Sequence, residues 1–345
     1  MVGANTKKKK RVALGLSGGV DSSVAAYLLK EKGYDVTAVY MKCWGDDTKG
    51  CGVEEDKMYA VQSAAHLDIK FEQLDFRKEY KEKVIQYFYD EYRAGRTPNP
   101  DVMCNKEIKF GLFFDWAVKN NFDYVSTGHY ARIRGESLLK GVDASKDQSY
   151  FLYLLNRNQL KKILFPIGDL TKKEVRALAK KIGLPTQNRP DSMGICFIGE
   201  VNIRKFLEEQ ISPKKGKVIN TIGEVIGEHD GIWYYTIGQR HGFKIKKYTG
   251  VPLYVIKKDA EKNELIVGEE KKCYSKEFDV ENIHWINKPV AVKKLGVRIR
   301  HLGEVYPAGI NNNHVMLEKP AFGVAPGQSA VFYLGDEVLG GGIIK

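Results

Sequence analysis

A glycine-rich segment at residues 15–22, G-L-S-G-G-V-D-S, constrains the fold of this chain more than any other stretch. It joins an apolar run at 11–16, typical of a buried strand, to an amphipathic run at 22–31, typical of a helix. Its glycines let the backbone turn tightly, and the start of a helix offers unpaired N–H groups and partial positive charge. The segment therefore predicts a phosphate-binding loop, although an ordinary strand-to-helix turn has similar composition.

Strand-like and helix-like patterns alternate through the first part of the chain. Extended patterns occur at 35–40, 69–74 and 123–127, and helical patterns at 60–66 and 80–92. Such alternation predicts an α/β fold, with a parallel, doubly wound sheet. Ligands of these sheets bind beyond the carboxyl ends of the strands, where the glycine-rich segment is expected to lie.

The later part of the chain has a different texture. Thr171 and Glu174 form a capping box before a further helix, which Gly183 ends. After about residue 210, short glycine-punctuated runs dominate, and the runs at 297–301 and 328–333 alternate apolar and polar residues. We expect one α/β domain followed by β-rich modules.

Charge and cysteine content limit the possible functions. The 345 residues carry a net charge of +12, which favours a polyanionic partner such as nucleic acid, although it also serves solubility. No stretch approaches the roughly 20 apolar residues that span a bilayer, and the N-terminus lacks a signal-peptide core. We therefore expect a cytoplasmic protein without membrane association.

The five cysteines do not suggest a structural role. Their number is odd and no C-x-x-C pair occurs, which argues against a secreted disulfide framework. A zinc site at Cys43, Cys51 and His66 would lack the usual ligand spacing, so no metal site is predicted from these side chains.

Cys104 lies near the start of a predicted helix. Asn99 can cap this helix and Pro100 suits its first position, and an apolar stripe continues to Trp116. The helix dipole and Lys106 would favour the reactive thiolate of Cys104. Asp101, three residues earlier, could share the same face and exchange protons if its pKa is raised.

Cys196 stands in a short apolar run flanked by Gly194 and Gly199. The glycines could leave its backbone exposed at the end of a strand. For Cys104 and Cys196 alike, the alternative is burial as a small inert hydrophobic residue.

Seven sequence blocks, taken together, carry a resemblance to a known family. The loop S-G-G-V-D-S resembles that of the PP-loop ATP pyrophosphatases, which cleave ATP between its α- and β-phosphates. It is accompanied by P-N-P-D-V-M-C-N-K-E-I-K-F, S-T-G-H-Y-A-R, K-D-Q-S-Y-F-L, G-I-C-F-I-G, Y-T-I-G-Q-R-H-G and A-P-G-Q. Together these blocks resemble the tRNA-specific 2-thiouridylases, over nearly the whole chain.

The resemblance implies a three-domain architecture and a set of functional residues. It implies a Rossmann-like PP-loop domain at 1–207, a small β-rich central domain at 208–274 that binds tRNA, and a C-terminal β-barrel at 275–345. By the same resemblance, ATP is held by Gly15, Leu16, Ser17, Gly18, Gly19, Val20, Asp21, Ser22, Met41 and Gly128. Cys104 would be the nucleophile, Cys196 the persulfide carrier and Asp101 the acid/base, while contacts to tRNA would come from Asn99, Pro100, Asp101, His129, Lys146, Asp147, Gln148, Arg300, His301 and Gln328.

The implied reaction is ATP-dependent 2-thiolation of the wobble uridine in tRNAs of the Lys, Glu and Gln type. Adenylation of the C2 oxygen makes it a good leaving group, and Cys196 delivers sulfur that Cys104 helps to release. Asp21 suits a Mg²⁺-assisted site, since carboxylates and phosphates are the ligands that Mg²⁺ prefers. The partners would be tRNA and a sulfur-donor protein, with the chain acting as a monomer. A catalytic Cys104–Cys196 disulfide would remain after each turnover.

Two other functions remain open from the residues. A small-molecule adenylating ligase would share the loop chemistry without needing the cysteine pair or the positive charge. A tRNA-binding module that does not consume ATP would need the charge but neither Asp21 nor the cysteines.

Overall fold

The computed structural model describes residues 9–45, 52–191, 194, 196, 198, 202–247, 250–288 and 294–345. The chain divides into two compact units. The first contains residues 1–81, 101–199 and 336–338, and the second contains 82–100, 200–335 and 339–345.

A five-stranded parallel sheet forms the centre of the first unit. Its order is β3 (Lys70–Asp75), β2 (Asp35–Lys42), β1 (Arg11–Gly15), β4 (Tyr124–Ser126) and β7 (Ile163–Leu164). Strand β1 pairs in parallel with both β2 and β4, so the strand order reverses at this point. In open parallel sheets, ligands bind where the order reverses, and here the loops that follow β1 and β4 meet.

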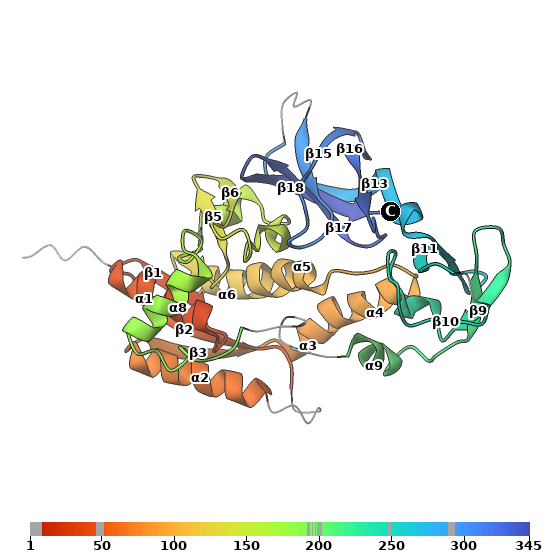
Figure 1. Cartoon of the computed structure of the whole chain (residues 1–345). Helices are drawn as coiled ribbons and strands as arrows, with labels where there is room; N and C mark the ends of the chain where they lie inside the picture. The colour runs from red at the N-terminus through yellow and green to blue at the C-terminus, as the bar shows by residue number, and fades with distance from the viewer. Residues whose placement is uncertain are drawn as a thin grey trace, which may run out of the picture. The chain divides into compact units, whose positions relative to one another are not determined.

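Helices cover both faces of this sheet (Figure 1). Helices α1 (Val20–Glu31) and α2 (Gly52–His66) share one face, and α8 (Lys172–Lys181) packs against α1. The other face carries one long helical segment, formed by α5 (Pro100–Cys104), η2 (Asn105–Leu112) and α6 (Phe113–Lys119). Shorter elements are α3 (Arg77–Tyr80), η3 (Ser149–Leu152), α7 (Arg157–Leu160) and the hairpin of β5 (Ala131–Arg134) and β6 (Ser137–Lys140).

Local sequence signals account for these elements. The capping box before α8 is confirmed, because the Thr171 side chain accepts from the Glu174 N–H while the Glu174 carboxylate accepts from the Thr171 N–H. The helix predicted from residue 100 is present, but its middle part, η2, is π-helical rather than α-helical. Gly111 permits this wider turn, since a Cβ there would lie only 2.8 Å from the Lys106 carbonyl oxygen.

The second unit contains two β structures. A five-stranded sheet has the order β10 (Lys244–Ile245), β9 (Val225–His229), β8 (Gly216–Ile219), β12 (Glu264–Gly268) and β11 (Tyr254–Asp259). A closed antiparallel barrel has the order β13 (Tyr274–Trp285), β16 (His314–Phe322), β15 (Tyr306–Asn311), β14 (Leu295–Arg298), β17 (Ser329–Leu334) and β18 (Glu337–Ile344). It closes because β13 also pairs with β18.

Short helical pieces complete the second unit. Within it, α4 (Gln86–Arg93) follows the π-helical η1 (Lys81–Ile85), and Tyr89 of α4 stacks on Phe206 of α9 (Ile203–Glu208). The remaining pieces are the 3₁₀ turns η4 (Ile232–Tyr234) and η5 (Glu270–Cys273). The predicted fold class, a Rossmann-like parallel domain followed by a β-rich domain and a β-barrel, is confirmed. The domain boundaries at 207 and 274 stay a prediction.

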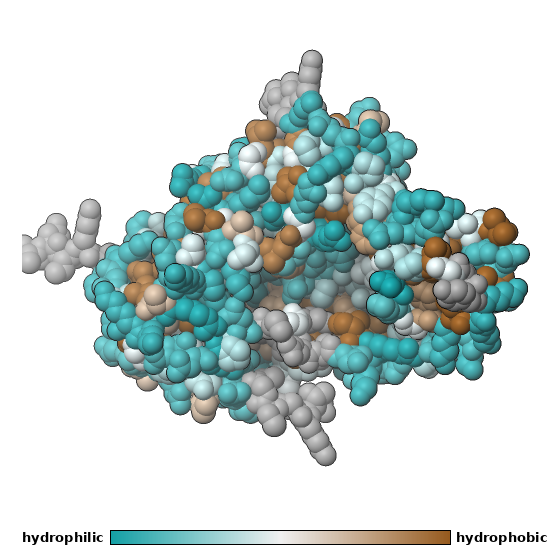
Figure 2. Space-filling view, in the orientation of Figure 1, coloured by the Kyte–Doolittle hydropathy of each residue, from teal (hydrophilic) through white to brown (hydrophobic). Residues whose placement is uncertain are grey.

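The surface gives no sign of a membrane segment in the described part of the chain, where no helix is long and apolar enough to cross a bilayer. On the face drawn in Figure 2, hydrophilic residues predominate and hydrophobic ones are scattered among them. Large exposed apolar side chains such as Ile222 and Met58 do occur, as they do on ordinary protein surfaces.

Candidate active site

The glycine-rich loop has the geometry of an anion seat. Gly19 is the N-cap of α1, and no side chain of the described residues caps it, so the N–H groups of the first turn are available to a ligand. Ser22 holds the loop from inside, because its hydroxyl accepts from the Ser17 N–H at 3.2 Å and donates to the Gly19 carbonyl at 3.1 Å. Gly18 has φ +81°, and a Cβ there would overlap the Asp56 carbonyl oxygen.

Residues predicted from outside the loop gather around it. A Cβ at Gly128, after β4, would lie 2.6 Å from the Ser22 nitrogen, so only glycine fits there. The methyl group of Met41 lies 3.0 Å from the position of a Cβ at Gly15. Leu16 and Val20 are buried, so only their backbone can face a ligand. The structure thus brings the predicted nucleotide residues together.

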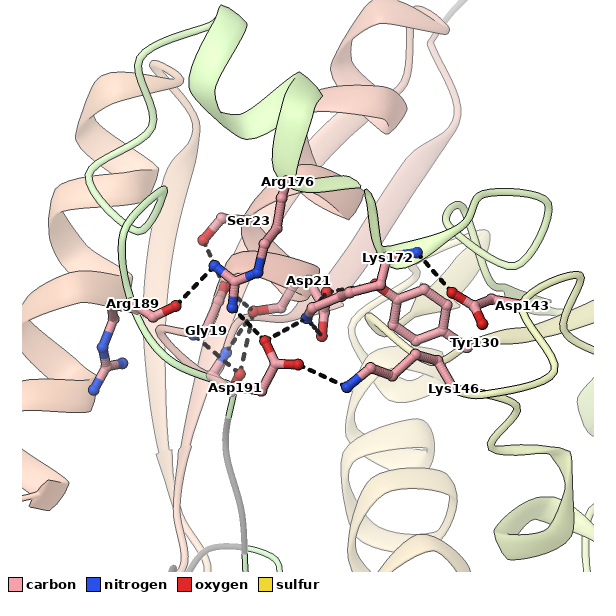
Figure 3. Close-up of polar contacts among 12 residues, drawn as sticks. Gly19, Asp21, Ser23, Tyr130, Asp143, Lys146, Lys172, Arg176, Arg189 and Asp191 are labelled. Carbon is pink, nitrogen blue, oxygen red and sulfur yellow. Dashed lines mark hydrogen bonds and ion pairs between the residues drawn. The ribbon is translucent and has the colours of Figure 1, made fainter. Parts of the chain in front are cut away.

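The carboxylate of Asp21 is engaged by two groups (Figure 3). The Lys172 ammonium donates to its two oxygens at 2.7 and 2.8 Å, and the Tyr130 hydroxyl donates to one of them at 2.7 Å. Lys172 is the first residue of α8, so the capping box at Thr171 fixes where this cation lies. Asp21 can bind a metal ion only by exchanging some of these contacts.

A second carboxylate, Asp191, shares Lys172 with Asp21 (Figure 3). It pairs with Lys146 at 2.7 Å, with Lys172 at 3.0 Å and with Arg176. Burial alone would raise the pKa of Asp191, but these three partners hold it well below its usual range. Ion pairs therefore fasten the chain five residues before Cys196 to the ATP-loop region.

Cys104 and Cys196 lie together in a second cluster of the first unit. Their side chains are hydrogen-bonded to each other, and both cysteines are free rather than disulfide-bonded. The Cys196 N–H donates to the Asp101 carboxylate at 3.0 Å, and the Tyr80 hydroxyl donates to the Cys196 carbonyl at 2.6 Å. The positive charge of Lys109 also acts on the Cys196 sulfur.

These contacts divide the two thiols into an acidic and a weakly acidic one. The hydrogen bond from Cys104 and the charge of Lys109 lower the pKa of Cys196, whereas complete burial raises the pKa of Cys104. The expectation that Lys106 favours a Cys104 thiolate is wrong, because Lys106 pairs with Glu107 at 3.3 Å instead. Lys109, one turn later, supplies the positive charge, and it acts mainly on Cys196.

Asp101 has the property predicted for an acid/base. Burial raises its pKa, against the opposing effects of the Cys196 N–H and the Lys109 charge. Cys43 is buried, and burial raises the pKa of its thiol. Cys51 lies outside the described residues. Within the described ranges no cluster of three or more His, Cys, Asp or Glu side chains could hold a metal ion.

The residues predicted to touch tRNA have different environments in the first unit. His129 is buried between Phe110 and Phe165, and its ring nitrogen Nδ1 bonds the Thr127 hydroxyl at 2.7 Å. Burial, together with the charge of Lys109, lowers the pKa of His129 well below its usual value. It is therefore neutral at physiological pH.

The side chains of residues 146–148, which were predicted to contact tRNA, make hydrogen bonds and ion pairs within the protein. Asp147 is buried and accepts from the Gly141 and Ser149 N–H groups at 3.0 and 3.1 Å. Gln148 accepts from the Tyr130 N–H at 3.0 Å. Lys146 belongs to the Asp191 cluster, so its ammonium lies near the ATP loop.

In the second unit, Gln328 has a clear structural partner. Its side-chain amide donates to the carbonyls of Thr97 and Pro98, each at 3.0 Å, directly before Asn99. The Thr97 N–H in turn donates to the Pro326 carbonyl at 2.8 Å. The A-P-G-Q turn therefore holds the segment that leads into N-P-D. Arg300 is exposed and His301 is half-buried.

Sequence reasoning missed several residues that the structure brings to these clusters, namely Tyr80, Lys109, Tyr130, Lys172, Arg176 and Asp191. Lys172 and Arg176 follow the capping box one turn apart, a spacing that places both on one helix face. Lys109 would not have been found in this way, because its position depends on the π-helical turn.

Family models match this chain in three consecutive segments, from residue 10 to residue 344. Residues 10–200 match the family described as "tRNA methyl transferase HUP domain", residues 204–269 its "PRC-barrel domain", and residues 275–344 an "Aminomethyltransferase beta-barrel domain". The "tRNA-specific 2-thiouridylase MnmA 1" of Geobacillus kaustophilus is 48% identical, over 98% of this chain and 96% of its own. The "tRNA-specific 2-thiouridylase MnmA" of Buchnera aphidicola is 45% identical, over 98% of both chains.

Among solved structures, the "U34-tRNA thiolase NcsA from Methanococcus maripaludis" matches 59% of this chain and 64% of its own. Its TM-score is 0.37 and its sequence identity is 19%. A match this distant says nothing about activity.

Proposed function

The chain belongs to the tRNA-specific 2-thiouridylase family, and from this premise we propose that it replaces the C2 oxygen of the wobble uridine in tRNA with sulfur, using ATP. The expected substrates are tRNAs of the Lys, Glu and Gln type. The observation that carries the proposal is the hydrogen-bonded pair of Cys104 and Cys196 beside Asp101, in the same unit as the glycine-rich loop.

The first step is adenylation of the base. The uridine C2 oxygen attacks the α-phosphorus of ATP, the bond between the α- and β-phosphates breaks, and pyrophosphate leaves. The N–H groups at the start of α1 suit the phosphates, and Lys146, Lys172 and Arg176 can turn from Asp191 to the departing pyrophosphate. Mg²⁺ bound with the nucleotide would neutralise phosphate charge, and Asp21 is the carboxylate suited to hold it.

The second step delivers sulfur. Cys196 carries the sulfur as a persulfide, whose terminal atom bonds to C2 while AMP leaves. The Cys104 thiolate attacks the Cys196 sulfur, so the persulfide bond breaks and the outer sulfur stays on the base. Asp101, with its raised pKa, accepts or donates the proton that this exchange requires.

The product enzyme holds a Cys104–Cys196 disulfide, which two electrons from a thiol reductant return to the free thiols. The cytoplasm provides such reductants, and we propose that the chain works there as a monomer. The sulfur donor is a persulfide-bearing protein. The wobble base must leave the anticodon stack to reach the site, and we propose that Asn99, Pro100 and Asp101 meet it there.

Thiolation in vitro tests the proposal. Purified protein is incubated with ATP, Mg²⁺, unmodified tRNA and a persulfide donor, and the digested nucleosides are analysed by mass spectrometry. We expect 2-thiouridine with the parent protein and none with Cys104→Ser or Cys196→Ser. Cys273→Ser serves as the matched control, because this cysteine lies in the second unit and carries no proposed role.

Two outcomes would favour other functions. Pyrophosphate exchange stimulated by a metabolite but not by tRNA would indicate a small-molecule ligase. Salt-sensitive tRNA binding without ATP consumption would indicate a binding module. Full thiolation by both cysteine variants would contradict the mechanism.

A further inference from the structure

Lys109 occupies a position that the mechanism above does not use. It lies in η2, is half-buried, and its charge favours a negative sulfur on Cys196. The exposed Lys106 of the same helix, in contrast, pairs with Glu107. A partly buried lysine loses hydration of its ammonium group. If the ammonium stays charged, a negatively charged partner must offset this loss.

Among the described residues, Lys109 is the cation whose charge acts on Cys196. Its neighbours with titratable groups come from several elements and are Cys43 after β2, Tyr80 of α3, Asp101 and Cys104 of α5, and Lys109 of η2. In this described set Lys109 supplies the cation, while Asp101 disfavours a negative sulfur. Burial alone would lower the pKa of Lys109, but the two thiols and Asp101 raise it, so the ammonium stays protonated.

The π-helical turn explains how Lys109 reaches the site. Five residues separate Cys104 from Lys109, which in a regular α-helix would turn the two side chains roughly 140° apart. A π-helix closes its hydrogen bonds from residue i to i+5 and so brings these positions to nearly the same face. Such turns are frequent at functional sites, and this one puts the ammonium on the cysteine side of the helix.

We propose that Lys109 is a catalytic residue whose ammonium stabilises negative sulfur on Cys196, first as the thiolate that accepts sulfur and then as the persulfide anion. The proposal rests on the sulfur-transfer role given to Cys196 above. It assigns to Lys109 the loading of the enzyme, whereas Cys104 and Asp101 act at the base.

The loading step balances without a redox change. The Cys196 thiolate attacks the outer sulfur of a donor persulfide, R–S–SH, so that a new S–S bond forms at Cys196 and the donor S–S bond breaks. The donor leaves as the thiolate R–S⁻ and takes up a proton from water. The resulting Cys196 persulfide loses its own proton readily, and Lys109 faces the anion that remains.

If Lys109 had a purely structural role, its task would be to neutralise the half-buried Asp101. The two roles differ in what happens to the Cys196 thiol when the charge is removed. If Lys109 serves Asp101 alone, neutralisation of Lys109 leaves the reactivity of Cys196 unchanged. If it serves sulfur, the thiolate fraction of Cys196 falls.

The test is the pH profile of Cys196 alkylation in the full-length, reduced protein. Iodoacetamide is added at pH values from 5 to 10, and labelling of the Cys196 peptide is followed by mass spectrometry. For Lys109→Met we expect an upward shift of the apparent pKa by about one unit or more, which is at least about fivefold slower labelling at pH 7. Lys109→Arg should keep the parental profile, and Lys106→Met is the matched control on the same helix.

A second arm measures loading itself. Inorganic polysulfide replaces the protein donor, and the mass gain of one sulfur on the Cys196 peptide is timed; Lys109→Met should load about tenfold more slowly. An unchanged pH profile of Cys196 alkylation in folded Lys109→Met would overturn the proposal. If Lys109→Met does not fold, a shifted pH profile in Lys109→Arg would overturn it. The two proposals can fail separately. If Lys109→Met loads sulfur slowly but the parent protein does not thiolate tRNA, the role of Lys109 is supported and the proposed function is rejected.

Discussion

Single residues decide the shape of the ATP loop and the state of the thiols. Gly18 and Gly128 are glycines because neighbouring backbone leaves no room for a Cβ, and both could be predicted from the sequence blocks. Lys109 could not, because its position depends on the π-helical turn and on tertiary packing that no local pattern encodes. The same limit explains the wrong assignment of the thiolate partner to Lys106 instead of Lys109.

Replacing Gly18 with alanine tests the loop at the residue scale. The new Cβ would meet the Asp56 carbonyl at a residue with φ +81°, so we expect a loss of roughly 2–3 kcal/mol of unfolding free energy and about 100-fold weaker ATP-dependent thiolation. Gly33→Ala is the control, because Gly33 has φ +82° but nothing near its Cβ position. It should lose only about 1 kcal/mol and keep its activity. Equal losses in both variants would show that the close approach to Asp56 is unimportant.

Asp191 gives a pH-dependent prediction. Its pKa is depressed in the folded state, so its stabilising contribution is present above the unfolded pKa of about 4 and is lost as the pH falls through the folded value. We expect Asp191→Asn to unfold with about 1–2 kcal/mol less free energy at pH 7, allowing for partial solvent screening. In urea titrations the deficit should stay constant from pH 7 to 5 and shrink below pH 4. A deficit that grows in acid would contradict the ion-pair account.

At the scale of elements, the periodic patterns predicted the helices and strands well, because burial of one face imposes them. The helix predicted from residue 100 continues to Lys119, yet its π-helical middle was not foreseen, since a single wider turn leaves the apolar stripe nearly intact. The glycine-punctuated runs after about residue 210 predict β-rich modules, but residues 232–234 form a 3₁₀ turn. Aromatic residues after glycine suit either structure, so the sequence alone could not separate them.

The A-P-G-Q turn provides a prediction at the element scale. Gln328 donates to two backbone carbonyls before N-P-D, so Gln328→Leu should cost about 1–2 kcal/mol of unfolding free energy even without RNA. Thiolation should fall with it, while ATP binding should persist. The exposed Gln210→Leu is the control and should change neither quantity. If Gln328→Leu weakens tRNA binding without any change in stability, the residue contacts RNA directly rather than holding the segment.

At the scale of the whole molecule, the net charge predicted a polyanionic partner, and the order of the sequence patterns predicted the fold class. The alternation of strands and helices followed by β texture was enough for the fold class, because each layer arrangement has its own hydrophobic period. The closed barrel and the strand order within it depend on long-range pairing, and only the family resemblance supplied the barrel.

The net charge of +12 leads to a prediction about tRNA binding. If lysines and arginines neutralise about six phosphates, affinity should fall by about 10³-fold between 50 and 200 mM salt. Filter binding across this range, at constant Mg²⁺, gives the slope. A binding constant that is independent of salt would show that the basic surface does not meet the RNA backbone.

The central claim is that this chain activates the C2 oxygen of a tRNA uridine with ATP and then replaces it with sulfur. The most direct test uses tRNA whose wobble uridine carries ¹⁸O at C2, with both the nucleoside and the AMP examined by mass spectrometry after one turnover. The account predicts 2-thiouridine without ¹⁸O and one ¹⁸O atom in AMP. Thiolated tRNA accompanied by unlabelled AMP would contradict it.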